Sequence, residues 1–146
     1  TGIPFKDKAF DLVLACEVIE HLVDTDSFLQ ECKRILVKGG ELIVSTPNVA
    51  SLHNRFILLR GGYPHNLSYN CIGESHVRAF NQEKLLDIIK ENGFSIKKIV
   101  GSDLSLPILW RSSALMQGIT SVANAIGFNR AFPGLFQNII VKAIKE

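Results

Sequence analysis

The chain has 146 residues, 47% of them apolar, which is enough for one hydrophobic core of ordinary size. Sixteen basic and fourteen acidic residues give a net charge of +2 and are spread without runs. This charge pattern argues against a nucleic-acid partner or a polybasic membrane anchor and favours a small-molecule partner. No apolar run in the sequence approaches the roughly 20 residues of a transmembrane segment.

Three cysteines, Cys16, Cys32 and Cys71, are widely spaced and form no CxxC pair. An odd number of scattered cysteines is typical of reduced thiols rather than of a disulfide framework or a zinc site. The first residues of the sequence do not resemble an export signal. We therefore expect a cytoplasmic protein.

The first predicted element is an apolar strand, Phe10 to Ala15, which only Asp11 interrupts. A strand that is apolar toward both faces belongs in the middle of a covered sheet, because edge strands normally carry charges or proline. We therefore expect a neighbouring strand on each of its flanks.

A helix and a second strand are predicted next. Asp24 to Ser27 offers several N-cap residues, and Ser27 with Gln30 matches a capping box. Gly39-Gly40 should end this helix, and Glu41 to Thr46 then reads as an apolar strand. The strand–helix–strand order predicts a parallel pair. The apolar residues at helical spacing are Phe28, Leu29, Cys32, Ile35 and Leu36.

The pattern loosens from Asn48 to Phe80, where only Ser51 to Leu59 predicts a short helix. Long irregular segments in compact domains are usually lids or substrate loops. We expect a single domain with a crevice unit at 1–48, a substrate loop at 49–80 and C-terminal helices and strands at 81–146. The elements predicted in this last part are a helix capped by Asn81 and ended by Gly93, a strand over Phe94 to Val100, a helix from Leu115 to Ile126 and a strand over Asn138 to Ile144.

The sequence resembles the C-terminal half of a class I S-adenosylmethionine-dependent methyltransferase, in the group that includes the ubiquinone-pathway O-methyltransferases. The resemblance implies a partial Rossmann-like α/β fold holding strands four to seven of a seven-stranded sheet, with the last strand antiparallel. The family's glycine-rich cofactor loop has no counterpart here, so we interpret the chain as a fragment that is inactive alone. The motifs that carry the resemblance are Ile3-Pro4-Phe5, Phe10-Asp11-Leu12-Val13, Glu17-Val18-Ile19-Glu20-His21, Leu36 to Gly40, Thr46-Pro47-Asn48, His76-Val77-Arg78-Ala79-Phe80 and Asn92-Gly93-Phe94.

The resemblance also implies S-adenosylmethionine as the cofactor. Ligands of open α/β sheets lie beyond the carboxyl ends of the strands, where the strand order reverses. Ala15, Cys16 and Glu17 lie at such a strand end, and the resemblance implies that they contact the cofactor, together with the Pro4-Phe5 pair. In an alternative reading, Cys16 only fills space and Glu17 is a solvated carboxylate at a helix start.

Glu20 and His21 are the predicted catalytic residues. Methyl transfer depends largely on positioning, and a base is needed only if the acceptor loses a proton. An imidazole such as that of His21 suits this role, although its ring could instead bond the backbone and shape the crevice. Glu17, Glu20 and His21 are alternatively a divalent cation site that orients a catechol-like acceptor. The string ExxEH lacks the first histidine of the inverted zincin motif, which argues against a protease.

His76 and Arg78 precede a helix in a loop predicted to cover the crevice. They suit a carboxylate, phosphate or sugar hydroxyl of the substrate, or else a salt bridge that fixes the loop. Asn48, Arg55 and Tyr63 are further substrate-binding candidates on the same side.

The sequence thus predicts methyl transfer to an oxygen or nitrogen atom of a small molecule. One rival is a non-catalytic interaction module, a half-domain whose partner chain supplies strands one to three. Another is half of a nicotinamide-dependent oxidoreductase, which leaves Glu20-His21 and the His76 to Phe80 motif unexplained. Aromatic residues of the tail could line an apolar acceptor pocket, form a homodimer face or cover the core; they are Trp110, Phe128, Phe132 and Phe136.

Overall fold

The computed structural model describes residues 2–64, 67, 76–105 and 113–146; Cys71 and Trp110 lie outside these ranges. None of the helices among the described residues is long and apolar enough to cross a membrane. In chain order the elements are β1 (Phe10–Cys16), the 3-10 helix η1 (Ile19–His21), α1 (Thr25–Ile35), β2 (Leu36–Pro47), α2 (Leu52–Leu59), α3 (Gln82–Glu91), β3 (Phe94–Ser102), α4 (Ser113–Ala125), α5 (Phe128–Ala131), the 3-10 helix η2 (Pro133–Leu135) and β4 (Asn138–Lys145).

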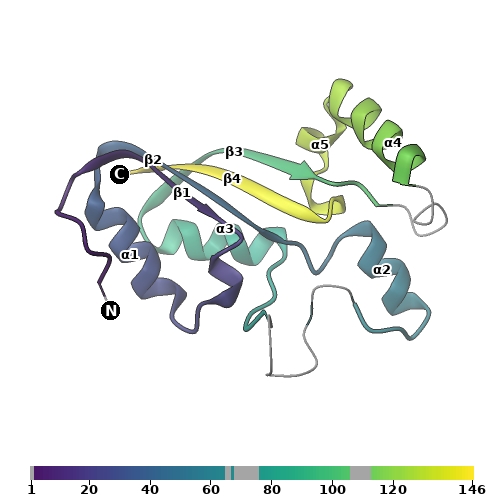
Figure 1. The fold of residues 1–146 in the computed structure, drawn as a ribbon, viewed down its shortest axis with the longest axis horizontal. Coiled ribbons are helices and arrows are strands. Elements are labelled where there is room, and N and C mark those ends of the chain that lie inside the picture. Colours follow the sequence, from purple (N-terminus) through teal and green to yellow (C-terminus); the bar gives the residue numbers. More distant parts are fainter. Residues whose placement is uncertain (1, 65–66, 68–75, 106–112) are drawn as a thin grey trace.

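The strands of the described residues form one mixed sheet in the order β1-β2-β4-β3. β1 pairs parallel with β2, whereas β4 pairs antiparallel with both β2 and β3. Figure 1 shows α1 and α3 on one side of the sheet and α4 and α5 on the other side, near one end. The predicted α/β class and the antiparallel last strand are confirmed.

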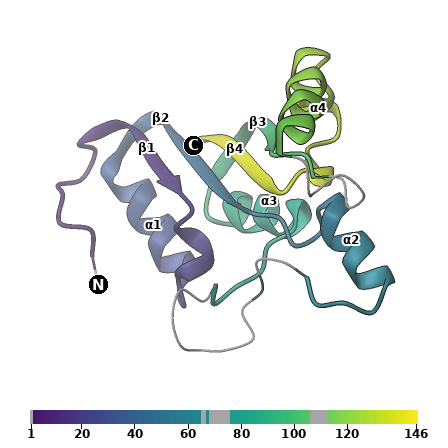
Figure 2. The same ribbon diagram turned by 45° about the vertical axis from the view of Figure 1, so that its right-hand side comes forward.

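The main core fills the space between the sheet and the helices α1 and α3, which lie on the same side of it (Figure 2). Cys32 lies within this core, where burial raises the pKa of its thiol to about 11, as expected of an unreactive structural cysteine. The fully buried residues that form this core include Ile19, Leu29, Leu36, Leu42, Val44, Leu85, Ile89, Ile139, Val141 and Ala143.

A smaller cluster lies under α4 and α5. Phe136 is fully buried there beside Leu104 and Ala123. Its side chain occupies the space next to Gly101, where an added Cβ would stand 2.5 Å from the Phe136 ring, so only glycine fits at this point of β3. Phe136 therefore covers the core, whereas Phe132 is 54% exposed.

β1 is an edge strand in the described part of the chain, with β2 as its one neighbour. We expected a neighbour on each flank, so this prediction is not met within these residues. The consequence is exposed apolar surface, because Leu12 and Leu14 are 44% and 62% exposed. An apolar edge strand with open backbone groups readily pairs with another strand.

The boundary between α1 and β2 corrects the sequence prediction. The helix ends at Ile35 rather than at Gly39-Gly40, and Leu36 already pairs with Phe10 of β1. The register then shifts, so that Leu12 pairs with Glu41 and the glycines lie in an irregular part of the strand. Leu36 continues the apolar spacing of the helix, and for this reason the periodicity does not reveal where the helix ends.

The predicted helix starts are mostly confirmed. Ser51 caps α2 and Asn81 caps α3, each by accepting a hydrogen bond from the backbone three residues later. α1 is capped by Asp24, which accepts from the Ser27 N–H at 2.9 Å, and the predicted Ser27–Gln30 capping box is not the cap.

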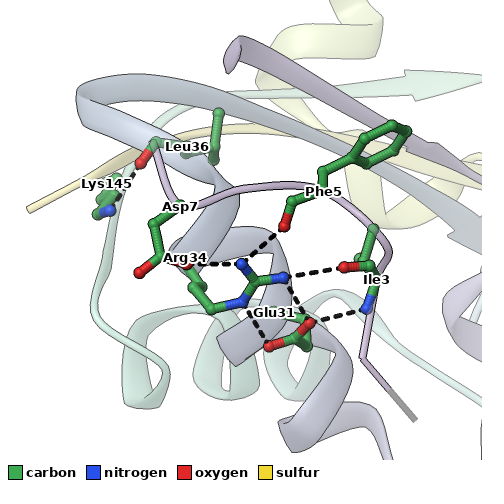
Figure 3. A network of polar contacts seen from close by, with 7 residues as sticks. All are labelled: Ile3, Phe5, Asp7, Glu31, Arg34, Leu36 and Lys145. Atoms are coloured by element: carbon green, nitrogen blue, oxygen red, sulfur yellow. Dashed lines mark hydrogen bonds and ion pairs between the residues drawn. The ribbon is translucent and has the colours of Figure 1, made fainter. Parts of the chain in front are cut away.

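Arg34, near the end of α1, fastens the segment before β1 to the helix (Figure 3). Its guanidinium donates to both carboxylate oxygens of Glu31 at 2.8 and 2.9 Å and to the carboxylate of Asp7 at 2.7 Å. It also donates to the carbonyl oxygens of Ile3 and Phe5, both at 2.9 Å. All five N–H donors of the arginine are therefore used, which fixes how the chain enters β1.

We predict that Arg34→Lys lowers the midpoint of thermal unfolding by roughly 2 to 8 °C. Lysine keeps the positive charge but loses the planar fork that holds four partners at once. Circular dichroism during heating measures the change. The exposed Arg130 of α5 offers a matched control, since Arg130→Lys should leave the midpoint unchanged. Equal midpoints for wild type and Arg34→Lys would contradict the role given to this arginine.

The same network predicts a pH dependence. Hydrogen bonds from Arg34 and the Ile3 N–H lower the pKa of Glu31 to about 2. A lowered folded-state pKa stabilises the fold at high pH, and this contribution is lost as the pH falls from about 4.5 to about 2. We therefore expect Glu31→Gln to unfold at a lower temperature than wild type at pH 7, and the difference to close toward pH 2. A difference that stays constant over this range would contradict the prediction.

Candidate active site

The candidate site lies where the parallel strands β1 and β2 end. Cys16, the last residue of β1, is paired with Ser45 near the end of β2. Residues that follow β1 are therefore held beside the last residues of β2. This is the edge of an open α/β sheet at which ligands bind.

Glu17 makes a tight turn directly after β1. Its φ of +53° lies in the left-handed region, which is uncommon for residues other than glycine. The Glu17 N–H points to the carbonyl and hydroxyl oxygens of Ser45, at 3.1 and 3.2 Å, and the Ser45 hydroxyl donates to Glu17 Oε1 at 2.7 Å. Ser45 thus holds both the backbone and the exposed carboxylate of this turn.

Glu20 is a buried carboxylate in η1, with only 1% of its surface exposed. Its Oε2 atom accepts a hydrogen bond from the Thr46 hydroxyl at 3.1 Å. Its Oε1 atom is buried, has no hydrogen-bond partner among the described residues, and lies 3.9 Å from Nε2 of His21. Because an unpaired buried carboxylate oxygen is costly, such an atom is a marker of a functional site.

His21 and His76 meet at this carboxylate. Their rings lie edge to face, with centroids 4.9 Å apart. Potential ligand atoms of Glu20, His21 and His76 all lie within 4.8 Å of one another. The backbone N–H groups of Val77 and Arg78 donate to the Glu20 carbonyl oxygen at 2.9 and 3.0 Å. The segment before α3 is thereby held against η1.

These three residues are the described group best suited to a metal ion, since two imidazoles and a carboxylate are common ligands of divalent transition metals. The set predicted from the sequence was different. Its third member, Glu17, does not belong to this group, and its carboxylate bonds to Ser45 instead.

Arg78 contacts the loop that follows η1. Its Nε donates to the carbonyl oxygen of Leu22 at 3.2 Å and its Nη2 to that of Val23 at 2.5 Å. The positive charge of Arg78 also contributes to the lowered pKa of Asp24, whose main cause is hydrogen bonding by Ser27. Arg78 therefore fixes the loop, through backbone carbonyls rather than through the predicted salt bridge.

Asn48 is fully buried, and its side chain forms hydrogen bonds with the backbone around it. Its side-chain amide donates to the carbonyl oxygens of Gly134 and Phe136, both at 2.9 Å, and its Oδ1 accepts from the Ala50 N–H at 3.0 Å. These bonds tie the end of β2 to the segment before β4. Asn48 also lines the open pocket that contains Arg55, so its contact with substrate stays a prediction.

Arg55 and Tyr63 are the remaining predicted substrate residues. Arg55 donates to the Ala50 carbonyl oxygen at 2.8 Å and lines an open pocket of about 460 Å³ that includes Asp87 and Lys90. Tyr63 is 57% exposed. His76 is the predicted substrate residue whose side chain lies close to those of Glu20 and His21.

The predicted cofactor contacts are divided between the two ends of β1. Ala15 is buried and Cys16 exposed at the carboxyl end, next to Glu17. The Pro4-Phe5 pair lies at the amino end, where the Phe5 ring meets Phe10 edge to face at a centroid distance of 4.9 Å. The ends of a seven-residue strand are about 20 Å apart, so this pair does not join the cluster.

Sequence reasoning missed Ser45 and Thr46, although both bond to predicted site residues. The sequence feature that could have revealed them is the pair of hydroxyl residues at the end of the second predicted strand. In a parallel pair they lie level with the acidic residues that follow the first strand.

Comparison with known proteins supports the family suggested by these motifs. Residues 1–44 match the family model described as a methyltransferase domain. A ubiquinone biosynthesis O-methyltransferase from Pelagibacter ubique is 31% identical over 100 residues. The chain belongs to the class I S-adenosylmethionine-dependent methyltransferases.

Other relatives of this methyltransferase chain agree. The human mitochondrial ubiquinone biosynthesis O-methyltransferase is 30% identical over 96 residues. A solved structure from Thermotoga maritima, described as a possible histamine N-methyltransferase, matches 99% of the chain and 60% of its own length, with a TM-score of 0.68 and 23% identity. That match shows the fold alone. The alignments cover 68% and 64% of this chain, but only 41% and 25% of the length of the Pelagibacter and human proteins, respectively.

We predict that Asn48 stabilises this methyltransferase fold. Asn48→Ala should lower the free energy of unfolding by about 1–3 kcal/mol, because it leaves the carbonyl oxygens of Gly134 and Phe136 without their donor, and the bond to Phe136 is buried. Urea unfolding measures the loss. The exposed Asn124 of α4 provides the control, as Asn124→Ala should leave the unfolding curve unchanged. An unaltered curve for Asn48→Ala would show that its hydrogen bonds are dispensable.

Proposed function

We propose that the protein transfers a methyl group from S-adenosylmethionine to an oxygen or nitrogen atom of a small-molecule acceptor. The observation that carries this proposal is the buried Glu20 carboxylate, whose Oε1 atom has no hydrogen-bond partner among the described residues, beside His21 and His76 at the ligand edge of a methyltransferase fold. The names of the relatives include both an O-methyltransferase and a possible N-methyltransferase. We therefore propose oxygen and nitrogen equally as the acceptor atom.

The cofactor side of the site is assigned to Ala15, Cys16 and Glu17. When bound, S-adenosylmethionine supplies a methyl group on a positively charged sulfur. The turn at Glu17 fits such a group, because it presents an exposed carboxylate at the carboxyl end of β1 and is held rigidly by Ser45. These residues form only part of the cofactor site, since the family's glycine-rich loop has no counterpart among them.

The acceptor side is assigned to His21, Glu20 and His76. The exposed imidazole of His21 is the group placed to take a proton from the acceptor. His76 comes from the segment docked on Glu20 and would contact the acceptor's polar atoms. Tyr63 and Arg55 are proposed only as outer contacts, and Arg78 acts by fixing the loop.

A divalent cation is a subordinate proposal. Glu20, His21 and His76 would hold it, and it would orient an acceptor oxygen. We further propose that the protein acts in the cytoplasm, in keeping with its scattered cysteines.

A second candidate function is a half-domain that works only when another segment or chain completes its sheet. The open edge of β1 favours it, because Leu12 and Leu14 remain exposed beside unpaired backbone groups. On this proposal, residues 1–146 alone bind S-adenosylmethionine poorly and associate through β1.

The two candidates are tested with the complete product of the natural gene and with residues 1–146 alone. We expect the natural gene product to bind S-adenosylmethionine in calorimetry and to transfer a labelled methyl group to one of a panel of phenols, catechols and amines. His21→Ala should lower kcat by roughly 100-fold or more. Arg130→Ala, in exposed α5, is the control expected to keep wild-type activity.

Tight cofactor binding by residues 1–146 alone would contradict the half-domain proposal. No cofactor binding by the natural gene product would overturn the methyltransferase proposal. Activity that persists after chelation and dialysis would exclude the cation.

A further inference from the structure

The turn after β1 carries a glutamate at a position where the backbone favours glycine. The φ of Glu17 is +53°, in the left-handed region. Glycine adopts this conformation readily, whereas a residue with a Cβ atom does so at a cost. Residues that keep such a conformation are concentrated at functional sites. The side chain of Glu17 should therefore have a role that glycine could not fill.

Ser45 fixes the direction of the Glu17 carboxylate. Ser45 is 8% exposed and is paired with Cys16, so the sheet sets the position of its hydroxyl. This hydroxyl donates to Glu17 Oε1 at 2.7 Å, and the Glu17 N–H lies 3.2 Å from the hydroxyl oxygen and 3.1 Å from the Ser45 carbonyl oxygen. One buried residue thus holds the backbone and the carboxylate of the exposed Glu17 together.

The charge of Glu17 is not neutralised within the part of the chain that the structure describes. None of the described lysine and arginine side chains forms an ion pair with it. Arg78, from the segment before α3, donates instead to the backbone carbonyl oxygens of Leu22 and Val23. An oriented carboxylate without a cationic partner, at the ligand edge of the sheet, suits a ligand that carries a positive charge.

We propose that the Glu17 carboxylate, with Ser45 as its positioning residue, makes the site prefer the positively charged sulfur of S-adenosylmethionine over the neutral sulfur of S-adenosylhomocysteine. This inference rests on the proposed function, and it adds what distinguishes the methyl donor from its product. The attraction acts through space, so it requires no hydrogen bond to sulfur. When the carbon–sulfur bond breaks, its electron pair stays on sulfur and the attraction is lost, which favours release of the product.

The test measures the affinity of the complete product of the natural gene for each of the two ligands by calorimetry. Glu17→Gln keeps the size of the side chain and removes its charge. It should weaken S-adenosylmethionine binding by roughly 3- to 10-fold and leave S-adenosylhomocysteine binding unchanged. Added salt should reduce the preference of wild type but not that of the variant. Glu91→Gln, at the exposed end of α3, is the matched control and should bind both ligands as wild type does.

Two further variants separate charge from backbone and from orientation. Glu17→Gly suits the left-handed turn, so the midpoint of thermal unfolding should not fall although the preference is lost. Ser45→Ala leaves the charge but no longer holds it, so the preference should shrink less than in Glu17→Gln, and Ser45→Thr, which keeps a hydroxyl, should restore it. If Ser45→Ala does not fold, the two Glu17 variants still decide the outcome.

The results distinguish this inference from the proposed function. Equal losses of affinity for both ligands in Glu17→Gln would overturn the inference, because the carboxylate would then act on a group that the two ligands share. Unchanged affinity for both would overturn it as well. A natural gene product that transfers a methyl group with an unaltered preference in Glu17→Gln refutes this inference alone. A natural gene product that binds neither ligand refutes the proposed function and this inference with it.

Discussion

The parallel register between β1 and β2 is the constraint on which the rest of the site depends. Backbone pairing sets Ala15 against Val44 and Cys16 against Ser45. Once these pairs form, the turn after β1 must lie against the last residues of β2. The turn at Glu17 and the helix η1 then bring the two carboxylates to the hydroxyls of Ser45 and Thr46.

This register is in turn held by the helix that connects the two strands. α1 buries Leu29 and Cys32 against the sheet, and Arg34 fastens the preceding segment to the same helix. The Lys145 ammonium donates to the Leu36 carbonyl oxygen at 2.7 Å, which joins the last strand to the start of β2. The structural framework lies mainly at the amino ends of β1 and β2, and the candidate chemistry lies at their carboxyl ends.

The sequence predicts the elements well because their signals are local. Helical spacing, caps such as Asn81 and the glycine after α3 all act within a few residues. The site was predictable only in part. The hydrogen bonds that define the site join residues 26 to 28 positions apart in the sequence. Contacts between such distant residues produce no periodic pattern in the sequence. The end of α1 was missed for another reason, since Leu36 fits the helical spacing and yet belongs to β2.

Glu20 links two parts of the site. Its backbone carbonyl oxygen accepts hydrogen bonds from the N–H groups of Val77 and Arg78, and its side-chain carboxylate lies beside His21. Residues 77 and 78 are therefore hydrogen-bonded to the same residue whose carboxylate lies beside His21, so the position of the segment before α3 and the position of this carboxylate depend on each other.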